Sequence, residues 1–244
     1  MLKNHIYTAL LVIFIILCSV NVKAQNNKTG TWGIVTVTLP GDSTHRWGGY
    51  IELQTRTNEL FNQAFYYEVK GGISYDIAKN YTALIGTGRY ITYDYNDLDG
   101  PPTALETRLW EQIQINQFLD RIKIEHRYRV EQRFFETGYK NRFRYRLNLA
   151  IPINHAKIGP KTWYGATFDE IFLNNKAPHF ERNRFYVGLG YQFDKSLSIQ
   201  AGLMHQYNYT LTTSGAKDNL AINVQYRFNR KNTRPKEQIP GMHD

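Results

Sequence analysis

Apolar and polar residues alternate almost without a break between Arg121 and Ile151. Successive side chains of a β-strand point to opposite faces, so this segment predicts two strands with one apolar wall and one charged wall. Soluble sandwiches use shorter strands, usually about 5–6 residues, whereas the strands of outer-membrane barrels have about 9–11. The segment therefore favours a barrel that is apolar outside and charged inside. The charged positions are Lys123, Glu125, Arg127, Arg129, Glu131, Arg133, Arg142, Arg144 and Arg146.

The same alternation recurs as far as Phe228 and predicts one all-β domain over residues 25–228, a closed antiparallel up-and-down transmembrane barrel. The candidate strands are Gly30–Leu39, His45–Arg56, Ala64–Tyr75, Tyr81–Tyr95, Glu106–Phe118, Arg121–Phe134, Lys140–Ile151, Lys161–Phe172, Arg182–Phe193, Leu197–Tyr209 and Asn219–Phe228. Single-chain bacterial barrels normally have an even number of strands. We therefore expect ten or twelve strands, with Gly30–Leu39 not spanning or with another strand missed or split.

Connections, glycines and aromatic residues fit this barrel. Short connections at Ile77–Asn80, Leu119–Asp120 and Asp194–Ser196 are expected at the periplasmic mouth, and longer ones at Asn96–Leu105, Leu173–Glu181 and Thr210–Asp218 at the extracellular mouth. Small residues help a sheet to curl, and inner-face glycines are expected at Gly86, Gly88, Gly188, Gly190 and Gly202. Aromatic girdles mark the two membrane interfaces, and their candidates are Trp32, Trp47, Tyr81, Tyr95, Trp163, Tyr191, Tyr207, Tyr209 and Tyr226.

Residues 1–24 resemble a secretory signal peptide. An apolar run from Ala9 to Val20 follows a short basic start, and Val22-Lys23-Ala24 precedes the expected cleavage site. The run is too short for a transmembrane helix, which disfavours a retained anchor. Cys18, the only cysteine, would leave with this segment, and its preceding Leu17 argues against a lipoprotein. These features predict export to the outer membrane, with residues 229–244 as a basic periplasmic tail.

The formal net charge of +9 raises the alternative of nucleic-acid binding. The arginines alternate with apolar residues along strands, which places them inside a barrel rather than on an open face. We therefore expect no nucleic-acid partner. The expected partners are outer-membrane lipid, small anionic solutes and the barrel-assembly machinery, since Phe228 resembles the aromatic end that this machinery recognises.

Five segments resemble an uncharacterised family of outer-membrane-type β-barrels, known as a domain of unknown function. They are RTNELF (Arg56–Phe61), EHRYRVEQRF (Glu125–Phe134), NRFRYRLNL (Asn141–Leu149), FDEIFLN (Phe168–Asn174) and NRFYVGLGYQF (Asn183–Phe193). The resemblance spans Trp32 to Phe228, and its HRYRxEQR core is the most specific part. It implies a barrel in a Gram-negative outer membrane and carries no catalytic residue, ligand or partner.

The charged inner positions are the first candidate site. A hairpin turn after Phe135 would bring Glu131 near Arg144 and Arg129 near Arg146, in a register that could slip by two residues. The next strand would add Asp169 or Glu170, of which we choose Asp169. Rings of arginine favour anions, so the ladder could line a narrow anion path. We prefer the alternative of an ion-pair network that fills the lumen, since a water channel needs about 16 strands.

Other chemistry is weakly indicated. His126 and His205 fall on the apolar face, where an outer-membrane lipid-modifying enzyme could keep its base, but tyrosines rather than serines lie two residues along. The histidines lack metal-ligand spacing, and the loop Asp94–Asp99 lacks the glycine and glutamate of a calcium loop. A soluble periplasmic ligand-binding barrel stays open as a further alternative, because the charged face could also be exposed to water. The large residues of the apolar face, such as Phe185, Leu189 and Tyr191, favour lipid instead. We expect no enzyme activity, no metal and no cofactor.

Overall fold

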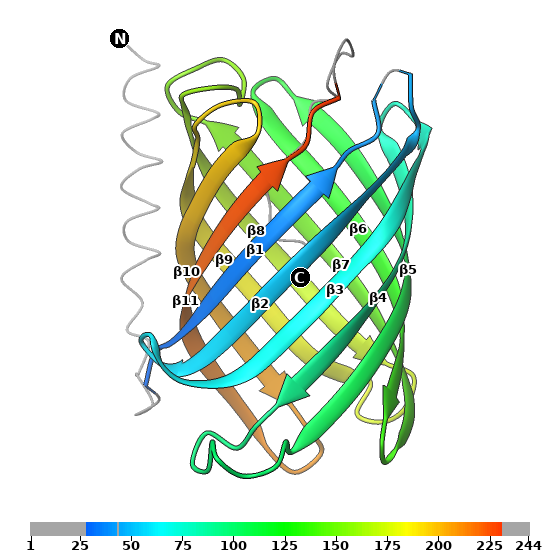
Figure 1. The fold of residues 1–244 in the computed structure, drawn as a ribbon, viewed down its shortest axis with the longest axis vertical. Coiled ribbons are helices and arrows are strands. Elements are labelled where there is room, and N and C mark those ends of the chain that lie inside the picture. The colour runs from blue at the N-terminus through cyan, green and yellow to red at the C-terminus, as the bar shows by residue number, and fades with distance from the viewer. Residues whose placement is uncertain (1–27, 43, 231–244) are drawn as a thin grey trace, which may run out of the picture.

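Eleven strands form one closed barrel in the computed structural model, which describes residues 28–42 and 44–230 (Figure 1). The strands are β1 (Gly30–Leu39), β2 (Trp47–Glu59), β3 (Asn62–Ala78), β4 (Tyr81–Thr92), β5 (Ala104–Leu119), β6 (Ile122–Phe135), β7 (Gly138–Pro152), β8 (Thr162–Asn174), β9 (Phe180–Gln192), β10 (Leu197–Tyr209) and β11 (Ser214–Arg227). The predicted signal peptide and residues 231–244 of the predicted tail lie outside the described residues. In the part of the chain that is described, no helix is both long and apolar enough to span a bilayer.

The barrel closes through a parallel pair, which corrects the expectation of ten or twelve strands. β1 pairs with β11 in parallel from Gly30↔Asn219 to Thr38↔Arg227, and their arrowheads point the same way in Figure 1. Each of the other neighbouring pairs is antiparallel and consecutive in the chain. An odd number of such strands leaves the first and the last running in the same direction, so their pairing must be parallel. Gly30–Leu39 is therefore a full member of the wall.

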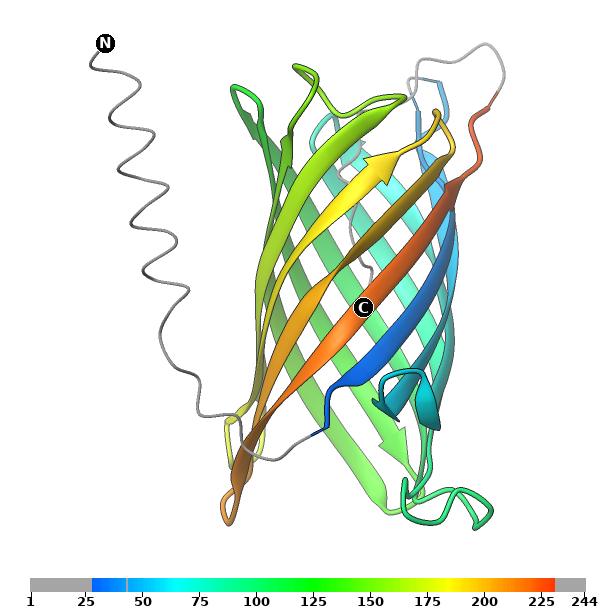
Figure 2. The ribbon, with the colours of Figure 1, turned by 90° about the vertical axis from the view of Figure 1, so that its left-hand side faces the viewer.

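The connections gather at two mouths (Figures 1 and 2). The N-mouth is the end where β1 and β11 begin, and it carries connections 60–61, 93–103, 136–137, 175–179 and 210–213. The C-mouth is the opposite end, with connections 40–46, 79–80, 120–121, 153–161 and 193–196. The three longer loops predicted for one mouth do share the N-mouth, and the three tight turns share the C-mouth. Loop length alone does not separate the mouths, because each has both tight and long connections.

The C-mouth turns have local polar stabilisation. At the β9–β10 turn, Oδ1 of Asp194 accepts hydrogen bonds from the backbone amides of Leu197 and Ser196, at 2.8 and 2.6 Å. These two bonds hold the pKa of the Asp194 carboxyl below its usual range. In the two-residue β5–β6 turn, Asp120 has a φ of 51°, a left-handed conformation that aspartate tolerates better than most residues.

The wall is apolar outside and polar inside. Large apolar side chains are exposed at alternate positions of every strand, for example Leu53 at 54% and Leu203 at 60%. The inner positions are buried, and many of them are charged. Two apolar clusters also fill parts of the lumen: Tyr50, Leu84 and Trp110 form one, and the other comprises Trp32, Ile34, Tyr164, Ala166, Phe168, Tyr186, Met204 and Ala221.

Aromatic pairs lie near both mouths on the outer face. Trp47 contacts Tyr75 with ring centroids 4.9 Å apart, and Trp163 contacts Tyr191 at 4.8 Å, near the C-mouth. Near the N-mouth the corresponding contacts include Phe134–Tyr139 and Phe180–Tyr207. Trp32 corrects the predicted girdle, because its side chain points inward and is 3% exposed.

Inner glycines leave room for the largest side chains of the lumen. A Cβ atom on Gly86 would lie 2.3 Å from the ring of Trp110, and one on Gly190 would lie 2.1 Å from the ring of Tyr164. Both rings are fully buried. The predicted inner-face placement is confirmed for Gly86, Gly88, Gly188, Gly190 and Gly202, each of which borders an inward side chain.

Replacing Gly86 with alanine should lower the free energy of unfolding by about 1–3 kcal/mol, because overpacking forces neighbours out of their preferred positions. Gly165→Ala is the matched control, since a Cβ atom there meets nothing within 4 Å. The control should leave stability unchanged or slightly increased. Urea titration of the refolded variants measures both, and equal midpoints would contradict crowding at Gly86.

Candidate functional site

The inner faces of β6 and β7 carry nine of the ten predicted lumen residues. Seven of these side chains are buried, namely Lys123, Arg127, Arg129, Glu131, Arg142, Arg144 and Arg146. Glu125 and Arg133 also point inward and are partly buried. The amide of Gln114 donates to Glu125 at 2.6 Å. The alternation along both strands thus brings the predicted charged wall together inside the barrel.

Asp169 is the exception and corrects the prediction. Its side chain is exposed on the outer face, where the amide of Asn183 donates to its Oδ1 at 2.9 Å. The next residue, Glu170, points inward and is 0% exposed. On β8 the inner set also contains Tyr164, Phe168 and Phe172, so apolar character did not distinguish the two faces of this strand.

Glu131 is the centre of one ion-pair cluster. Its Oε2 accepts from Nη2 and Nε of Arg142 at 2.5 and 2.8 Å, and its Oε1 accepts from Nη1 of Arg144 at 2.6 Å. Nη1 of Arg129 lies 3.6 Å from the same carboxylate. The Glu131 side chain is fully buried, so these arginines supply the charge compensation that a buried carboxylate requires.

The β6–β7 register differs from the expected one by two residues. Glu131 lies opposite Arg142, and Arg129 opposite Arg144. The turn comprises only Glu136 and Thr137, because Phe135 already pairs with Gly138. The longer turn expected from the sequence would have shifted every pair.

Glu170 is the centre of a second cluster and links three strands. Its Oε1 accepts from Nη2 of Arg127 at 2.6 Å and from Nε of Arg144 at 2.9 Å, and its Oε2 accepts from Nη2 of Arg146 at 2.6 Å. Arg144 therefore bridges the carboxylates of Glu131 and Glu170. The guanidinium groups of Arg144 and Arg146 also lie 4.5 and 4.1 Å from the ring centroids of Phe172 and Phe168. These contacts hold the cluster as one packed unit across β6, β7 and β8.

A third cluster lies on β1–β3, and our sequence reasoning did not find it. Nζ of Lys70 lies 2.7 Å from Oε1 of Glu52 and 2.6 Å from Oε1 of Glu68. The hydroxyl of Thr36 donates to the other Glu52 oxygen at 2.7 Å. The sequence contained a pattern that could have revealed this cluster. Charged residues occupy positions of the same face on two successive strands, namely Glu52 and Arg56 on β2 and Glu68 and Lys70 on β3.

Positive charge exceeds negative charge in the barrel interior. Of the described residues, ten basic side chains and five carboxylates are buried. The basic ones are Arg56, Lys70, Arg108, Lys123, Arg127, Arg129, Arg142, Arg144, Arg146 and Arg184, and the acidic ones are Glu52, Glu68, Glu106, Glu131 and Glu170. An interior with this excess has an electrostatic potential that favours anions over cations.

A cavity of about 290 Å³ opens inside the N-mouth. Among the described residues, its basic lining consists of Arg56, Arg108, Arg133, Arg142, Arg182, Arg184 and Lys217, and Glu106 is the one acidic residue of the lining. Arg142 belongs to both this lining and the Glu131 cluster, so the ion-pair network borders the cavity.

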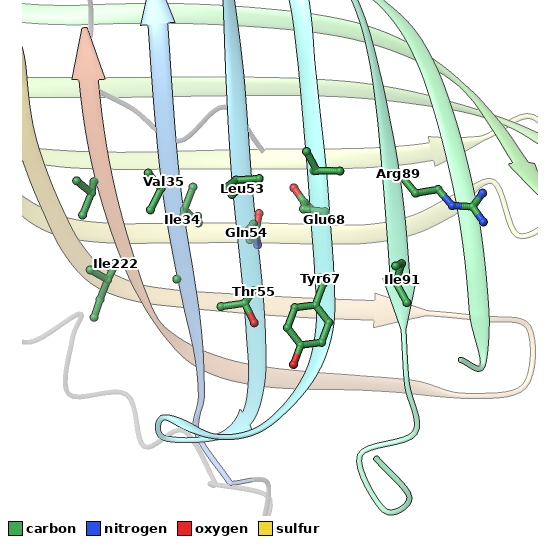
Figure 3. A pocket seen from close by; sticks show the side chains of 13 residues that line it. Ile34, Val35, Leu53, Gln54, Thr55, Tyr67, Glu68, Arg89, Ile91 and Ile222 are labelled. Carbon is green, nitrogen blue, oxygen red and sulfur yellow. The ribbon is translucent and has the colours of Figure 1, made fainter. Parts of the chain in front are cut away.

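The outer wall carries an apolar groove of about 530 Å³ across β1–β4 and β11 (Figure 3). Val35, Leu53 and Tyr67 line it from three adjacent strands (Figure 3). Arg89 borders it on β4 and reaches toward β5, where its Nη1 donates to the hydroxyl of Thr107 at 2.9 Å. An apolar concavity of this kind can accommodate hydrocarbon chains.

The two outer histidines lie where alternation predicted them. Nδ1 of His126 lies 2.9 Å from the hydroxyl of Tyr145, and Nδ1 of His205 lies 2.7 Å from Oδ1 of Asp218. Among the described residues neither histidine has a serine, threonine or cysteine as a hydrogen-bond partner. Over the same ranges, no three His, Cys, Asp or Glu side chains form a group that could hold a metal ion.

Comparisons with known proteins place the chain in a family. No curated protein and no solved structure matches it. A family model described as "Protein of unknown function (DUF2490)" matches residues 29–217, which include β1 to β10 and the residues of the Glu131 and Glu170 clusters. With its eleven-strand barrel and buried arginine–glutamate network, the chain belongs to the DUF2490 family.

Proposed function

We propose that this protein is an integral outer-membrane barrel whose lumen is closed by its arginine–glutamate network. The observation that carries the proposal is the distribution of polarity, with charged side chains buried inside and apolar side chains exposed outside. A soluble ligand-binding barrel has the opposite distribution. A bilayer is the environment in which an exposed apolar wall is stable.

The length of the strands and the aromatic pairs near both mouths support the membrane location. The strands have 10–17 residues, enough to cross a hydrocarbon core at the usual tilt. Tryptophan and tyrosine concentrate at membrane–water interfaces. The pairs Trp47–Tyr75 and Trp163–Tyr191 then mark the interface at the C-mouth. The longest connection between the described strands, residues 93–103, lies at the N-mouth, and on this basis we assign the N-mouth to the extracellular side.

The packing of the network supports a closed lumen. Arg127, Glu131, Arg144 and Glu170 are each 4% exposed or less, and they are joined by the short contacts described above. Barrels of about eight strands are filled by side chains, whereas water-filled porins need about 16. Eleven strands lie nearer the filled class. We therefore assign the network a structural role, as a plug that ties β6, β7 and β8 together.

A narrow anion path is the second candidate, because buried basic side chains outnumber buried carboxylates by two to one. Single-channel recording of the refolded protein in a planar bilayer under a salt gradient separates the candidates. A plug predicts no steady conductance from protein shown to be folded and inserted. Steady steps whose reversal potential indicates anion preference would overturn the plug and establish the path.

Single-channel recording of the variant Arg144→Ser tests the plug further. Arg144 bridges both carboxylates, so its removal should open space in the plug and produce or enlarge conductance. Lys79→Ser, in the exposed β3–β4 turn, is the matched control and should leave the record unchanged. Conductance that is identical in Arg144→Ser and the parent protein would contradict a plug centred on this residue.

A further inference from the structure

The N-mouth cavity has more basic side chains than its carboxylates neutralise directly. Arg108 holds both oxygens of Glu106, at 2.6 and 2.7 Å. Arg133 also contacts Glu106, and Arg142 is shared between Glu131 and Glu181. The carboxylates of Glu106, Glu131 and Glu181 are therefore already bound by these three arginines.

Arg182 and Lys217 are instead held by neutral groups. Nε of Arg182 donates to the amide oxygen of Asn208 at 2.6 Å, and its nearest carboxylate, that of Glu181, lies at 4.0 Å. Nζ of Lys217 donates to the backbone oxygen of Asn58 at 2.9 Å and to its side-chain oxygen at 2.5 Å. In the described part of the chain neither cation has a carboxylate oxygen closer than 4.0 Å, so their charge is only partly compensated and can act on the cavity.

Aromatic stacking orients two further arginines of the lining. The guanidinium of Arg56, on β2, lies 3.8 Å from the ring centroid of Trp32 on β1 and 4.1 Å from that of Tyr66 on β3. The guanidinium of Arg184 lies 4.8 Å from Trp32 and 4.7 Å from Phe172. A stacked arginine loses little conformational freedom when it binds an anion, and its planar fork matches the oxygens of phosphate or carboxylate.

We propose that the N-mouth cavity binds a small phosphate-bearing anion with two or more negative charges, held by Arg56, Arg182, Arg184 and Lys217. The volume of about 290 Å³ lies just below the usual range for ligand pockets, so it suits a small solute or a headgroup rather than a polymer. Opposed basic side chains from β2, β9 and β11 can contact such a ligand from several sides. This binding site is a separate proposal from the plug, and it does not depend on whether the lumen conducts ions.

Isothermal titration of the folded full chain tests the proposal with two probes. Inorganic pyrophosphate represents a soluble solute, and short-chain phosphatidic acid represents a lipid headgroup. Binding of either probe should weaken as salt is added, because the contacts are ionic. Preference for pyrophosphate assigns the site to a solute, and preference for phosphatidic acid assigns it to a headgroup.

Arg182→Gln and Lys217→Gln should each weaken the binding about tenfold, since a hydrogen bond to a charged group contributes at least that factor. Both side chains are partly exposed and lie outside the Glu131 and Glu170 clusters, so the variants should fold. Lys79→Gln removes the same charge at the C-mouth and should bind like the parent protein. Absence of binding for both probes, or equal weakening by Lys79→Gln, would overturn the site.

Discussion

Glu131→Ala should lower the free energy of unfolding by about 3–5 kcal/mol, because it removes a buried carboxylate that two buried arginines share. The substitution leaves Arg142 with the carboxylate of Glu181 and Arg144 with that of Glu170. Arg142 and Arg144 donate to the two oxygens of Glu131 at 2.5 and 2.6 Å, and all three side chains are at most 4% exposed. Urea titration of the refolded protein measures the loss.

Glu136→Ala is the matched control for this prediction. Glu136 lies five residues further along, in the exposed β6–β7 turn, and its removal should change stability by no more than about 0.5 kcal/mol. The double variant Glu131→Leu with Arg142→Leu should lose less than the sum of its two single variants, because it removes a charge pair rather than one partner. Equal stability of Glu131→Ala and Glu136→Ala would refute the role assigned to the Glu131 cluster.

Leu203→Arg should lower the free energy of unfolding in lipid vesicles by about 2–4 kcal/mol, the range for arginine at the midplane of a membrane barrel. Leu203 lies at the midpoint of β10, is 60% exposed on the outer face, and has Val187 and Leu220 as its cross-strand neighbours. In a bilayer this position faces hydrocarbon, where a guanidinium loses its hydration. Urea titration in vesicles, with the folded fraction read from gel mobility before and after heating, measures the effect.

Thr213→Arg, in the β10–β11 loop at the N-mouth, adds the same charge outside the apolar wall. It should leave stability within about 0.5 kcal/mol of the parent protein. On a water-facing wall Leu203→Arg would behave in the same way as Thr213→Arg. Equal effects of the two substitutions would therefore contradict the membrane location and favour a soluble barrel.

The strand count shows how a general rule can mislead where the pattern itself is sound. Eleven periodic segments were identified, and β1 and β10 have the predicted bounds. The even-number rule then led to an expectation of ten or twelve strands. That rule assumes antiparallel closure, whereas β1 pairs with β11 in parallel over nine residue pairs, Gly30 to Thr38. Parallel closure depends on two segments almost 190 residues apart, so it could not be predicted from the local sequence pattern of either segment.

In the candidate site, too, alternation placed some residues correctly and could not place others. On β6 and β7 one face is apolar and the other charged, so alternation alone assigned Arg127, Glu131 and Arg144 to the lumen. On β8 aromatic residues occupy the inner face, and Asp169 and Glu170 are adjacent, so composition could not choose between them. The choice depended on which residue faces the arginines of β7, and that contact exists only in the assembled sheet.

Alternation along the chain by itself determined an all-β protein with long strands, an apolar wall and a charged wall, because the side-chain direction in a strand follows from position alone. It also determined that arginines and glutamates share the inner wall. Only the tertiary structure decided the parallel closure, the two-residue shift between β6 and β7, the joining of Glu170 to Arg127 and Arg144, and the cavity at the N-mouth. These features depend on turn lengths and on contacts between distant strands, which are settled when the barrel closes.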